Sequence, residues 1–355
     1  DSITYFGGKS QQVEKNTRVK ARVKAHALRE IIESREHVMI MGHSISDTDA
    51  FGAAIGIYCA ARVLGKKAQI VLDQVTSSLR PLKEGFTTEK GYPPDMFVSS
   101  ERALELTDYN TLVMVVDVNR PSHTECPGLL KRTDSIVVFD HHRQSSEVIS
   151  NPVLSYIEPY ASSTCEMVAE VLQYFTENIK LAPHEADCIY AGILIDTSNF
   201  MTKTGVRTFE AAAYLKRCGA EVTRVRKMLR NDMDAYKARA EVVRHAEVYR
   251  GAFAISICPA DKIESPTIVG AQAADELLNI VGIKASFVLT EYQGKIYVSS
   301  RSIDEINVQK IMERLGGGGH LNMAGCQLRD CTVSQAQRII EDTIDEMLEE
   351  GDIEE

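Results

Sequence analysis

Several features that would assign a chain to a common class are absent from this sequence. No two of its eight cysteines have the CxxC spacing of a zinc finger, and at 355 residues a disulfide framework is not expected. No run approaches the roughly 18 apolar residues of a membrane-spanning helix, and no signal-peptide pattern opens the chain. Basic residues are not in excess, because the net charge is −10, which argues against a long groove for duplex nucleic acid. We therefore expect a soluble globular chain with reduced cysteines and no long nucleic acid as a partner.

The length of the chain, 355 residues, favours two domains, since single cores rarely grow beyond about 250–300 residues. The hydropathy pattern predicts a connector helix within residues 1–34, a first domain over 35–228, a linker helix within 229–250 and a second, smaller domain over 251–355. Because the sequence begins at Asp1 rather than at Met, we expect it to be a portion of a longer protein.

Short apolar runs alternate with helical stretches in the predicted first domain. These runs are rich in Val and Ile and too short for helices, and they are Val38–Met41, Gln69–Leu72, Leu112–Val118 and Ser135–Phe139. Near-continuous apolar strands separated by helices such as Ala50–Leu64 are typical of a parallel sheet covered on both faces. Ligands collect at the carboxyl ends of the strands in such sheets. The predicted fold class is therefore α/β, with a parallel sheet in the first domain.

The predicted second domain has a different pattern, in which alternating strands are flanked by helices. The expected strands are Phe253–Ile257, Ala285–Tyr292 and Ile296–Ser300, and the expected helices are Ile268–Ile280, Val308–Leu315 and Val333–Leu348. Thr332 and Gln335 match a capping box that opens the final helix. The stretch Asp234–Tyr249 is charged and free of Gly and Pro, which suits the linker helix. This order favours an α+β second domain.

Candidate metal ligands follow the apolar runs of the first domain. His43, Asp47 and Asp49 come directly after Val38–Met41, and Asp117 ends the run that begins at Leu112. Imidazole and carboxylate ligands suit manganese, magnesium or iron better than a metal that prefers thiolates. Each signal is weak alone, because Asp47 is also a favoured N-cap and a single Asp after a strand is often a turn residue.

Two further motifs extend this set. Asp140, His141 and His142 follow the strand that ends at Phe139, and Asp196 closes an apolar helical run. Side chains alternate in direction along a strand, so we expect one histidine to bind a metal while the other faces the substrate, with Asp140 orienting a ring from behind. A carboxylate at a helix C-terminus opposes the helix dipole unless a cation compensates, which favours a functional role for Asp196.

The second domain contains a run of four glycines, Gly316, Gly317, Gly318 and Gly319, followed by His320. Glycines let the backbone approach a ligand closely and expose N–H groups to a phosphate. Arg301 and His320 add hydrogen-bond donors that suit an anionic ligand. A flexible loop would explain the glycines equally well.

Together these residues resemble the motifs of the DHH phosphoesterase superfamily, in the same order along the chain. The resemblance covers His43-x-x-x-Asp47-x-Asp49, Asp117, Asp140-His141-His142 and Asp196, and it extends to the glycine run of the associated substrate-binding domain. It implies a metal-binding first domain in which His43 and Asp47 hold one divalent cation and Asp49, His141 and Asp196 hold a second. It further implies that Asp117 bridges the two cations and that the metal is manganese.

Three further stretches, 52–57, 196–209 and 307–312, make the resemblance more specific. They are similar to the membrane-anchored cyclic di-AMP phosphodiesterases of Gram-positive bacteria. This resemblance implies hydrolysis of cyclic di-AMP to linear 5′-pApA by two-metal activation of water, with Asp117 and His142 as catalytic residues. His142, Arg301, the four glycines and His320 would bind the substrate. It also implies a homodimer, and a cytoplasmic portion of a protein that is anchored in the bacterial cell membrane upstream.

An oligoribonuclease-like enzyme that degrades pApA shares the same metal ligands and stays open as the alternative function. A RecJ-like exonuclease fits the net charge of −10 less well. A family II pyrophosphatase would require more Lys and Arg near the glycine run. A nucleotide sensor without activity would be expected to have lost a ligand, and the ligand set in this sequence is complete.

Overall fold

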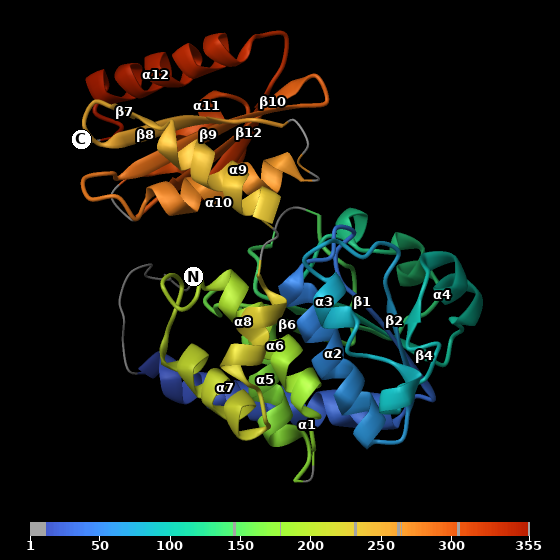
Figure 1. Cartoon of the computed structure of the whole chain (residues 1–355). Helices are drawn as coiled ribbons and strands as arrows, with labels where there is room; N and C mark the ends of the chain where they lie inside the picture. The colour runs from blue at the N-terminus through green and yellow to red at the C-terminus, as the bar shows by residue number, and fades with distance from the viewer. Residues whose placement is uncertain are drawn as a thin grey trace, which may run out of the picture. The chain divides into compact units, whose positions relative to one another are not determined.

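The chain forms two compact units, Asp1–Arg230 and Asn231–Glu355, each with its own hydrophobic core. The computed structural model describes residues 12–144, 147–177, 179–230, 233–260, 263, 265–303 and 306–353. Both units combine helices with a six-stranded sheet (Figure 1). The predicted α/β class with a second, smaller α+β domain is confirmed.

The sheet of the first unit is parallel throughout, with the strand order β3-β2-β1-β4-β5-β6. Its strands are β1 His37–Met41, β2 Lys67–Val71, β3 Phe97–Val98, β4 Thr111–Val116, β5 Ile136–Asp140 and β6 Leu154–Ile157. Every residue of β4 and β5 is buried, as expected for strands covered on both faces. The edge strands β3 and β6 were not predicted, because β3 has only two residues and the four-residue β6 is only partly apolar.

Helices cover both faces of this sheet. On one face the main helices are α1 Gln12–Glu33, α2 Thr48–Val63, α5 Thr164–Phe175 and α6 Pro183–Asp196, which share one apolar core with the sheet. The opposite face is covered by α4 Ser100–Leu106 and by the 3-10 turns η2 Pro121–His123 and η3 Pro127–Lys131. The first unit is completed by α3 Arg80–Lys83, η1 Thr88–Lys90, α7 Val206–Arg217 and α8 Val222–Met228.

The helix predicted as a connector within residues 1–34 is an integral part of the first unit. Ala21, Ala25, Leu28 and Ile32 recur on one face of α1 and are buried, so this part of the helix packs against the unit. Residues 1–11 of the predicted connector lie outside the described residues. The sparse apolar positions of this helix therefore form a single stripe that faces the first unit, and its predicted role as a connector to an upstream part stays a prediction.

The strand order places a topological switch between β1 and β4. The chain leaves β1 toward β2 and β3 on one side and then returns with β4 on the other side of β1. Crossover helices diverge at such a point and leave a crevice outside the carboxyl ends of the two strands, where α/β proteins bind their ligands. His43 follows β1 and Asp117 follows β4, so both lie at this crevice.

The second unit is a mixed sheet with the order β11-β12-β10-β9-β8-β7, in which only β8 and β9 are parallel among the described pairs. The strands are β7 Glu247–Tyr249, β8 Phe253–Cys258, β9 Ala285–Tyr292, β10 Lys295–Ser302, β11 Gly318–His320 and β12 Met323–Leu328. The helices α9 Met233–Arg244 and α10 Pro266–Leu277 cover one face, and α11 Val308–Arg314 and α12 Val333–Glu349 cover the other. The capping box of Thr332 and Gln335 opens α12 as predicted.

The predicted linker helix within residues 229–250 differs from the structure in two ways. The helix α9 ends at Arg244, and the chain then forms the strand β7. The helix also packs into the second unit, where Val242 is fully buried and its carbonyl accepts a hydrogen bond of 2.6 Å from the Ser256 hydroxyl. Ala235, Ala238 and Val242 lie on one stripe of α9 that faces this core, which explains why the helix is not a free linker.

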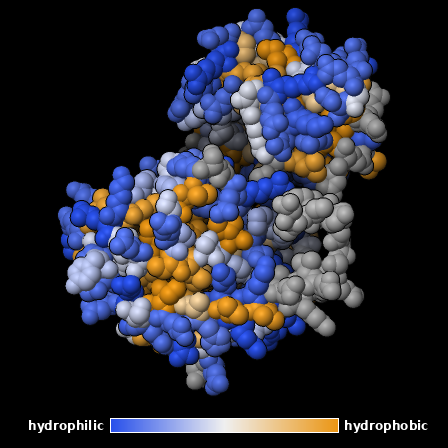
Figure 2. Space-filling model, turned by 180° about the vertical axis from the view of Figure 1, so that it is seen from behind, coloured by the Kyte–Doolittle hydropathy of each residue, from blue (hydrophilic) through white to orange (hydrophobic). Residues whose placement is uncertain are grey.

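Figure 2 shows that polar residues and apolar patches alternate on the face seen from behind. No helix among the described residues has the length and apolar character needed to cross a membrane. All eight cysteines are free, and six of them are buried, which confirms that the cysteines form no disulfide framework.

Candidate metal centre

Asp47 begins the helix α2 and also faces His43. Its Oδ1 accepts hydrogen bonds from the backbone N–H groups of Asp49 and Ala50, both at 3.0 Å, which makes it the N-cap of α2. Its Oδ2 lies 3.4 Å from Nε2 of His43. The two interpretations of Asp47 are therefore compatible, because one oxygen caps the helix while the other stays available as a ligand.

Asp117 has an unusual backbone conformation directly after β4. Its φ of 61° lies in the left-handed region, which costs a non-glycine residue on the order of 1–3 kcal/mol. The backbone N–H of Asp117 still pairs with the Phe139 carbonyl at 2.8 Å. The carboxylate is thereby aimed between two histidines, with Oδ2 at 3.6 Å from Nε2 of His43 and Oδ1 at 3.5 Å from Nε2 of His141.

The two adjacent histidines both face Asp117, which corrects the expected alternation. Nδ1 of His142 lies 3.6 Å from Oδ1 of Asp117, and the two imidazole rings are 4.4 Å apart. The alternation rule fails because β5 ends at Asp140, so His141 and His142 are no longer in extended strand conformation. The histidines differ in exposure instead, since the His141 side chain is 6% exposed and that of His142 is 49% exposed.

Asp140 supports His142 and not His141. Its Oδ1 accepts hydrogen bonds from the backbone N–H of His142 at 3.0 Å and from its ring Nδ1 at 2.8 Å. The amide of Asn119 donates to Oδ2. Asp140 is fully buried, so these contacts fix the His142 ring and leave its Nε2 for another partner. Nδ1 of His141 instead lies 3.4 Å from the Ala161 carbonyl.

Asp49 and Asp196 complete the arrangement around His141. Oδ2 of Asp196, the last residue of α6, is 3.3 Å from Nε2 of His141, and Oδ2 of Asp49 is 3.9 Å from the same nitrogen. Asp49 is fully buried and accepts hydrogen bonds from the first N–H groups of α5, those of Thr164 at 2.7 Å and Cys165 at 2.9 Å. A helix N-terminus is a favourable place for such a carboxylate.

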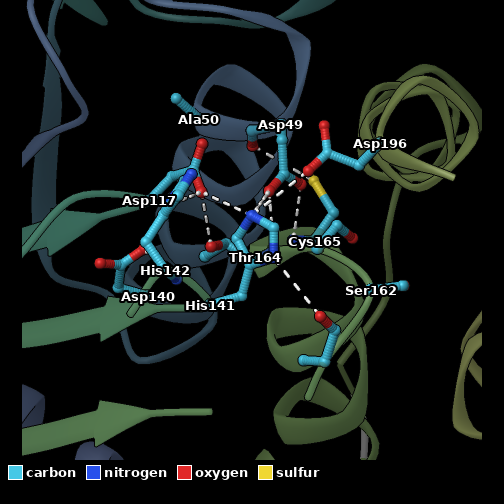
Figure 3. A network of polar contacts seen from close by, with 12 residues as sticks. Asp49, Ala50, Asp117, Asp140, His141, His142, Ser162, Thr164, Cys165 and Asp196 are labelled. Carbon is cyan, nitrogen blue, oxygen red and sulfur yellow. Dashed lines mark hydrogen bonds and ion pairs between the residues drawn. The ribbon is translucent and has the colours of Figure 1, made fainter. Parts of the chain in front are cut away.

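These side chains form three overlapping groups, and within each group the potential ligand atoms lie within 4.8 Å of one another. Figure 3 shows the two groups that contain His141. The groups are His43, Asp47 and Asp117; Asp49, His141 and Asp196; and Asp117, His141 and His142. Nε2 of His141 is buried and has no hydrogen-bond partner among the described residues. An orphaned imidazole nitrogen surrounded by carboxylates fits a divalent cation that would take its lone pair.

The electrostatics of the site also point to a cation. Burial, and then the neighbouring charges of Asp117 and Asp196, raise the pKa of the Asp49 carboxyl well above its usual value. Burial alone would lower the pKa of His141, but Asp196, Asp49 and Asp117 outweigh it and raise this pKa to about 10. Carboxylates this close repel each other and draw positive charge into the site.

Two supporting residues were missed by the sequence analysis, Thr164 and Asn119. The Thr164 hydroxyl donates to Oδ1 of Asp117 at 2.8 Å. The sequence does carry a local signal for the start of α5, because Ser163 and Glu166 have the spacing of a capping box. That signal predicts a helix start and says nothing of which carboxylates the first turn meets.

Two of the predicted substrate-binding residues of the second unit, Arg301 and His320, lie on strands that flank β12 in its sheet. Arg301 on β10 and His320 on β11 both pair with Met323 on β12, so they share one row across the sheet. Nε of Arg301 donates to Oδ1 of Asp275 at 2.8 Å, and Nη1 donates to the Ser300 carbonyl at 3.0 Å. The role of this row in binding substrate stays a prediction.

The sequence matches two family models. One is described as the DHH family, N-terminal domain, and matches residues 37–193; the other is the DHHA1 domain and matches residues 253–350. These matches correspond to the sheet regions of the two units.

Relatives with assigned functions match nearly the whole chain. It is 42% identical over 353 residues to the cyclic-di-AMP phosphodiesterase GdpP of Geobacillus thermodenitrificans, an alignment that covers 98% of this chain and 53% of that protein. It is 39% identical over 346 residues to the cyclic-di-AMP phosphodiesterase PdeA of Listeria monocytogenes, covering 97% of this chain and 52% of that protein. The chain therefore spans about half the length of the curated relatives it matches.

A solved structure shows the same fold at lower sequence identity. The exopolyphosphatase-related protein from Bacteroides fragilis superposes with a TM-score of 0.79 at 19% identity, over 92% of this chain and 96% of that chain. At this identity the likeness concerns the fold alone.

Proposed function

The chain belongs to the DHH family, and from this membership we propose that it is a metal-dependent phosphodiesterase that hydrolyses cyclic di-AMP to linear 5′-pApA. The observation that carries the proposal is the convergence of four carboxylates and three imidazoles, from His43 to Asp196, in overlapping groups with ligand atoms within 4.8 Å. Such a cluster would repel a phosphodiester by itself, so an anionic substrate requires cations in the same place. The identities of 42% and 39% to proteins named cyclic-di-AMP phosphodiesterases support the choice of substrate.

We propose that the site holds two divalent cations and that they are Mn²⁺, as the family resemblance implies. His43 and Asp47 would hold one cation, Asp49, His141 and Asp196 would hold the other, and Asp117 would contribute one oxygen to each. This assignment follows the split of the Asp117 oxygens between His43 and His141. Bound cations of this kind lower the pKa of water and neutralise charge on a reacting phosphate.

His142 is the side chain that we assign to the scissile phosphate. It borders the metal-ligand groups, yet its side chain is 49% exposed and therefore within reach of a bound molecule. The contact with Asp140 places the Nδ1 proton on the buried side of the ring, so Nε2 is the atom offered to the substrate. In that position His142 would stabilise charge on the phosphate or deliver a proton to the departing ribose oxygen.

Recognition of the rest of the dinucleotide is assigned to the second unit. Arg301, the run from Gly316 to Gly319 and His320 would bind the distal phosphate or an adenosine. The row that joins Arg301 and His320 through Met323 supports this grouping. We also propose that the protein acts as a homodimer in the cytoplasm and that its longer form is anchored in the cell membrane. The family resemblance supports these last two points.

Rates measured side by side on cyclic di-AMP and pApA, with Mn²⁺, test the proposal. We expect cyclic di-AMP to be converted to pApA, and Asp196→Asn to abolish the reaction because it removes a charged ligand beside His141. Asp73→Asn is the matched control, since Asp73 follows the neighbouring strand β2 and bonds to Ser100 outside the metal-ligand groups. Faster turnover of pApA than of cyclic di-AMP would favour the oligoribonuclease-like alternative, and unchanged turnover in Asp196→Asn would refute the metal assignment.

A further inference from the structure

We propose that Thr164 is a positioning residue that holds one carboxylate oxygen of Asp117 and one of Asp49 in place at the His141 side of the proposed metal centre. The inference rests on the proposed function of that centre. Thr164 is the first residue of α5 and is fully buried. It lies beside the ligand cluster, where its hydroxyl donates to Asp117 (Figure 3).

Thr164 contacts two of the proposed cation ligands, Asp117 and Asp49, through two separate donors. Its hydroxyl donates to Oδ1 of Asp117 at 2.8 Å, and its backbone N–H donates to Oδ2 of Asp49 at 2.7 Å. These are the two carboxylate oxygens of Asp117 and Asp49 that face Nε2 of His141. Thr164 therefore restrains both Asp117, which is assigned to the two cations together, and Asp49, which is assigned to one of them.

The first turn of α5 is itself held firmly, so Thr164 is a fixed reference point for these carboxylates. The Ser163 hydroxyl caps the helix by accepting the N–H of Glu166 at 3.0 Å. The Glu166 carboxylate is buried and accepts hydrogen bonds from the hydroxyls of Ser162 and Thr208, the second of which lies on α7. The turn is therefore tied both to its own loop and to a neighbouring helix.

The hydroxyl matters most for Asp117, because the backbone there is strained. The φ of Asp117 is 61°, a conformation that is unfavourable for a residue with a side chain. Contacts with neighbouring residues must therefore keep its carboxylate directed at both histidines. A hydrogen bond to one lone pair of Oδ1 fixes the direction of the remaining lone pair toward the cation position. Losing such a supporting contact to a ligand typically weakens metal binding by about 10–100-fold.

The test compares Mn²⁺ binding, measured by calorimetry on the full chain without substrate, across matched variants. Thr164→Val keeps the shape and backbone N–H of the residue but removes the hydroxyl, and Thr164→Ser restores the hydroxyl. We expect Thr164→Val to weaken at least one of two Mn²⁺ sites by about 10–100-fold and Thr164→Ser to bind within about threefold of the wild type. Thr164→Ala paired with Thr164→Ser repeats the comparison in case Val packs poorly, because these two variants differ only in the oxygen atom.

Thr111→Val is the control for a buried hydroxyl in the same strand system. Thr111 begins β4, the strand that ends before Asp117, and its buried hydroxyl donates to Oδ1 of Asp108 at 2.9 Å. We expect this variant to bind Mn²⁺ like the wild type. Tight binding in both Thr164→Val and Thr164→Ala would overturn the role of Thr164 alone, as would equal weakening in Thr164→Ser and Thr164→Ala. A wild-type chain that binds no Mn²⁺ would overturn the metal centre together with it.

Discussion

Asp140 is bonded to His142 twice, through the backbone N–H at 3.0 Å and through the ring Nδ1 at 2.8 Å. The pair belongs to one sequence motif, yet its geometry links a fully buried carboxylate to a half-exposed ring. The buried member determines the tautomer and orientation of the exposed one, in the way that a carboxylate orients a catalytic histidine in other hydrolases.

The first prediction concerns this pair. Asp140→Asn should lower kcat for cyclic di-AMP by about 10–100-fold, because an amide no longer stabilises the proton on Nδ1 of His142. Mn²⁺ affinity should change by less than about threefold, since Asp140 belongs to none of the three ligand groups. Steady-state kinetics with calorimetry of Mn²⁺ checks both statements. A loss of Mn²⁺ binding that parallels the loss of kcat would contradict this assignment of Asp140.

The second prediction distinguishes two carboxylates that bind the same proposed cation. Asp49→Ala should abolish activity and also lower the free energy of unfolding by about 1–3 kcal/mol, because the N–H groups of Thr164 and Cys165 lose their buried acceptor. Asp196→Ala should abolish activity with little change in stability, since Asp196 lies at the exposed end of α6 and its side chain is 19% exposed. Urea unfolding without added metal measures the difference. Equal stability of the two variants would contradict this explanation.

The third prediction concerns Arg62 on α2 and Glu185 on α6, which form a two-fold ion pair. Glu185 is fully buried and also accepts hydrogen bonds from the Ala182 N–H at 2.7 Å and the Tyr92 hydroxyl at 2.9 Å. Glu185→Gln should lower the free energy of unfolding at neutral pH by about 1–3 kcal/mol, because the buried acceptor loses its charge while its partner Arg62 stays 40% exposed. Glu105→Gln is the matched control, since its pair with Arg102 is more than half exposed on both sides and should contribute little.

The ion pair between Arg62 and Glu185 also makes the free energy of unfolding depend on pH, and the pKa of Glu185 decides the direction of the change. Burial alone would raise its pKa, but the Arg62 guanidinium and the Ala182 N–H outweigh burial and hold the pKa below the usual 4.5. The stabilisation is therefore fully present above about pH 4.5 and is lost as the pH falls through the lowered value. Unfolding curves of the wild type and Glu185→Gln should converge in that acidic range. A difference that persists unchanged to low pH would refute this account.

The fourth prediction compares two glycines of the run at 316–319, one where a side chain would not fit and one where it would. A Cβ on Gly319, whose φ is 150°, would lie 2.4 Å from the Met323 carbonyl oxygen and from Cα of Ala324, whereas a Cβ on Gly318 would meet nothing within 4 Å. Gly319→Ala should therefore destabilise the second unit by about 2 kcal/mol or more through strain and overlap with β12. Gly318→Ala should leave stability within about 0.5 kcal/mol of the wild type.

Gly318 can therefore test whether the glycine run contacts the substrate. Packing explains Gly317 and Gly319, and a positive φ of 75° explains Gly316, but neither reason applies to Gly318. If the backbone here approaches a phosphate, Gly318→Ala should raise KM for cyclic di-AMP several-fold while the melting temperature stays the same. A KM equal to that of the wild type would indicate that Gly318 does not contact the substrate.

Much of this protein could be predicted from the sequence, because the informative signals are local. Short apolar runs followed by acids and histidines predict buried parallel strands whose carboxyl ends meet at one edge. This rule alone brings His43, Asp117 and His141 together, although they follow three different strands. The helix α2 and the capping box of α12 were equally readable from local pattern.

The failures of the sequence analysis arose where tertiary contacts override local pattern. Alternation along a strand predicted that His141 and His142 would point apart, but β5 ends one residue earlier and both rings face Asp117. The sparse apolar positions of residues 1–34 did not indicate a packed helix, but a single stripe that includes Leu28 and Ile32 buries one face of α1 in the first unit. Strand ends and helix partners depend on neighbours that are distant in sequence.

The sequence by itself therefore determined which residues can bind metal and at which edge of the sheet they gather, since both follow from residue chemistry and strand periodicity. Only the tertiary structure decided how these residues are aimed. The left-handed backbone of Asp117 and the contacts of Thr164 with Asp117 and Asp49, which span 47 and 115 residues, have no local signature. They arise because the first turn of α5 packs against the crevice between β1 and β4, and the position of one helix against distant strands is set by the packing of the whole core.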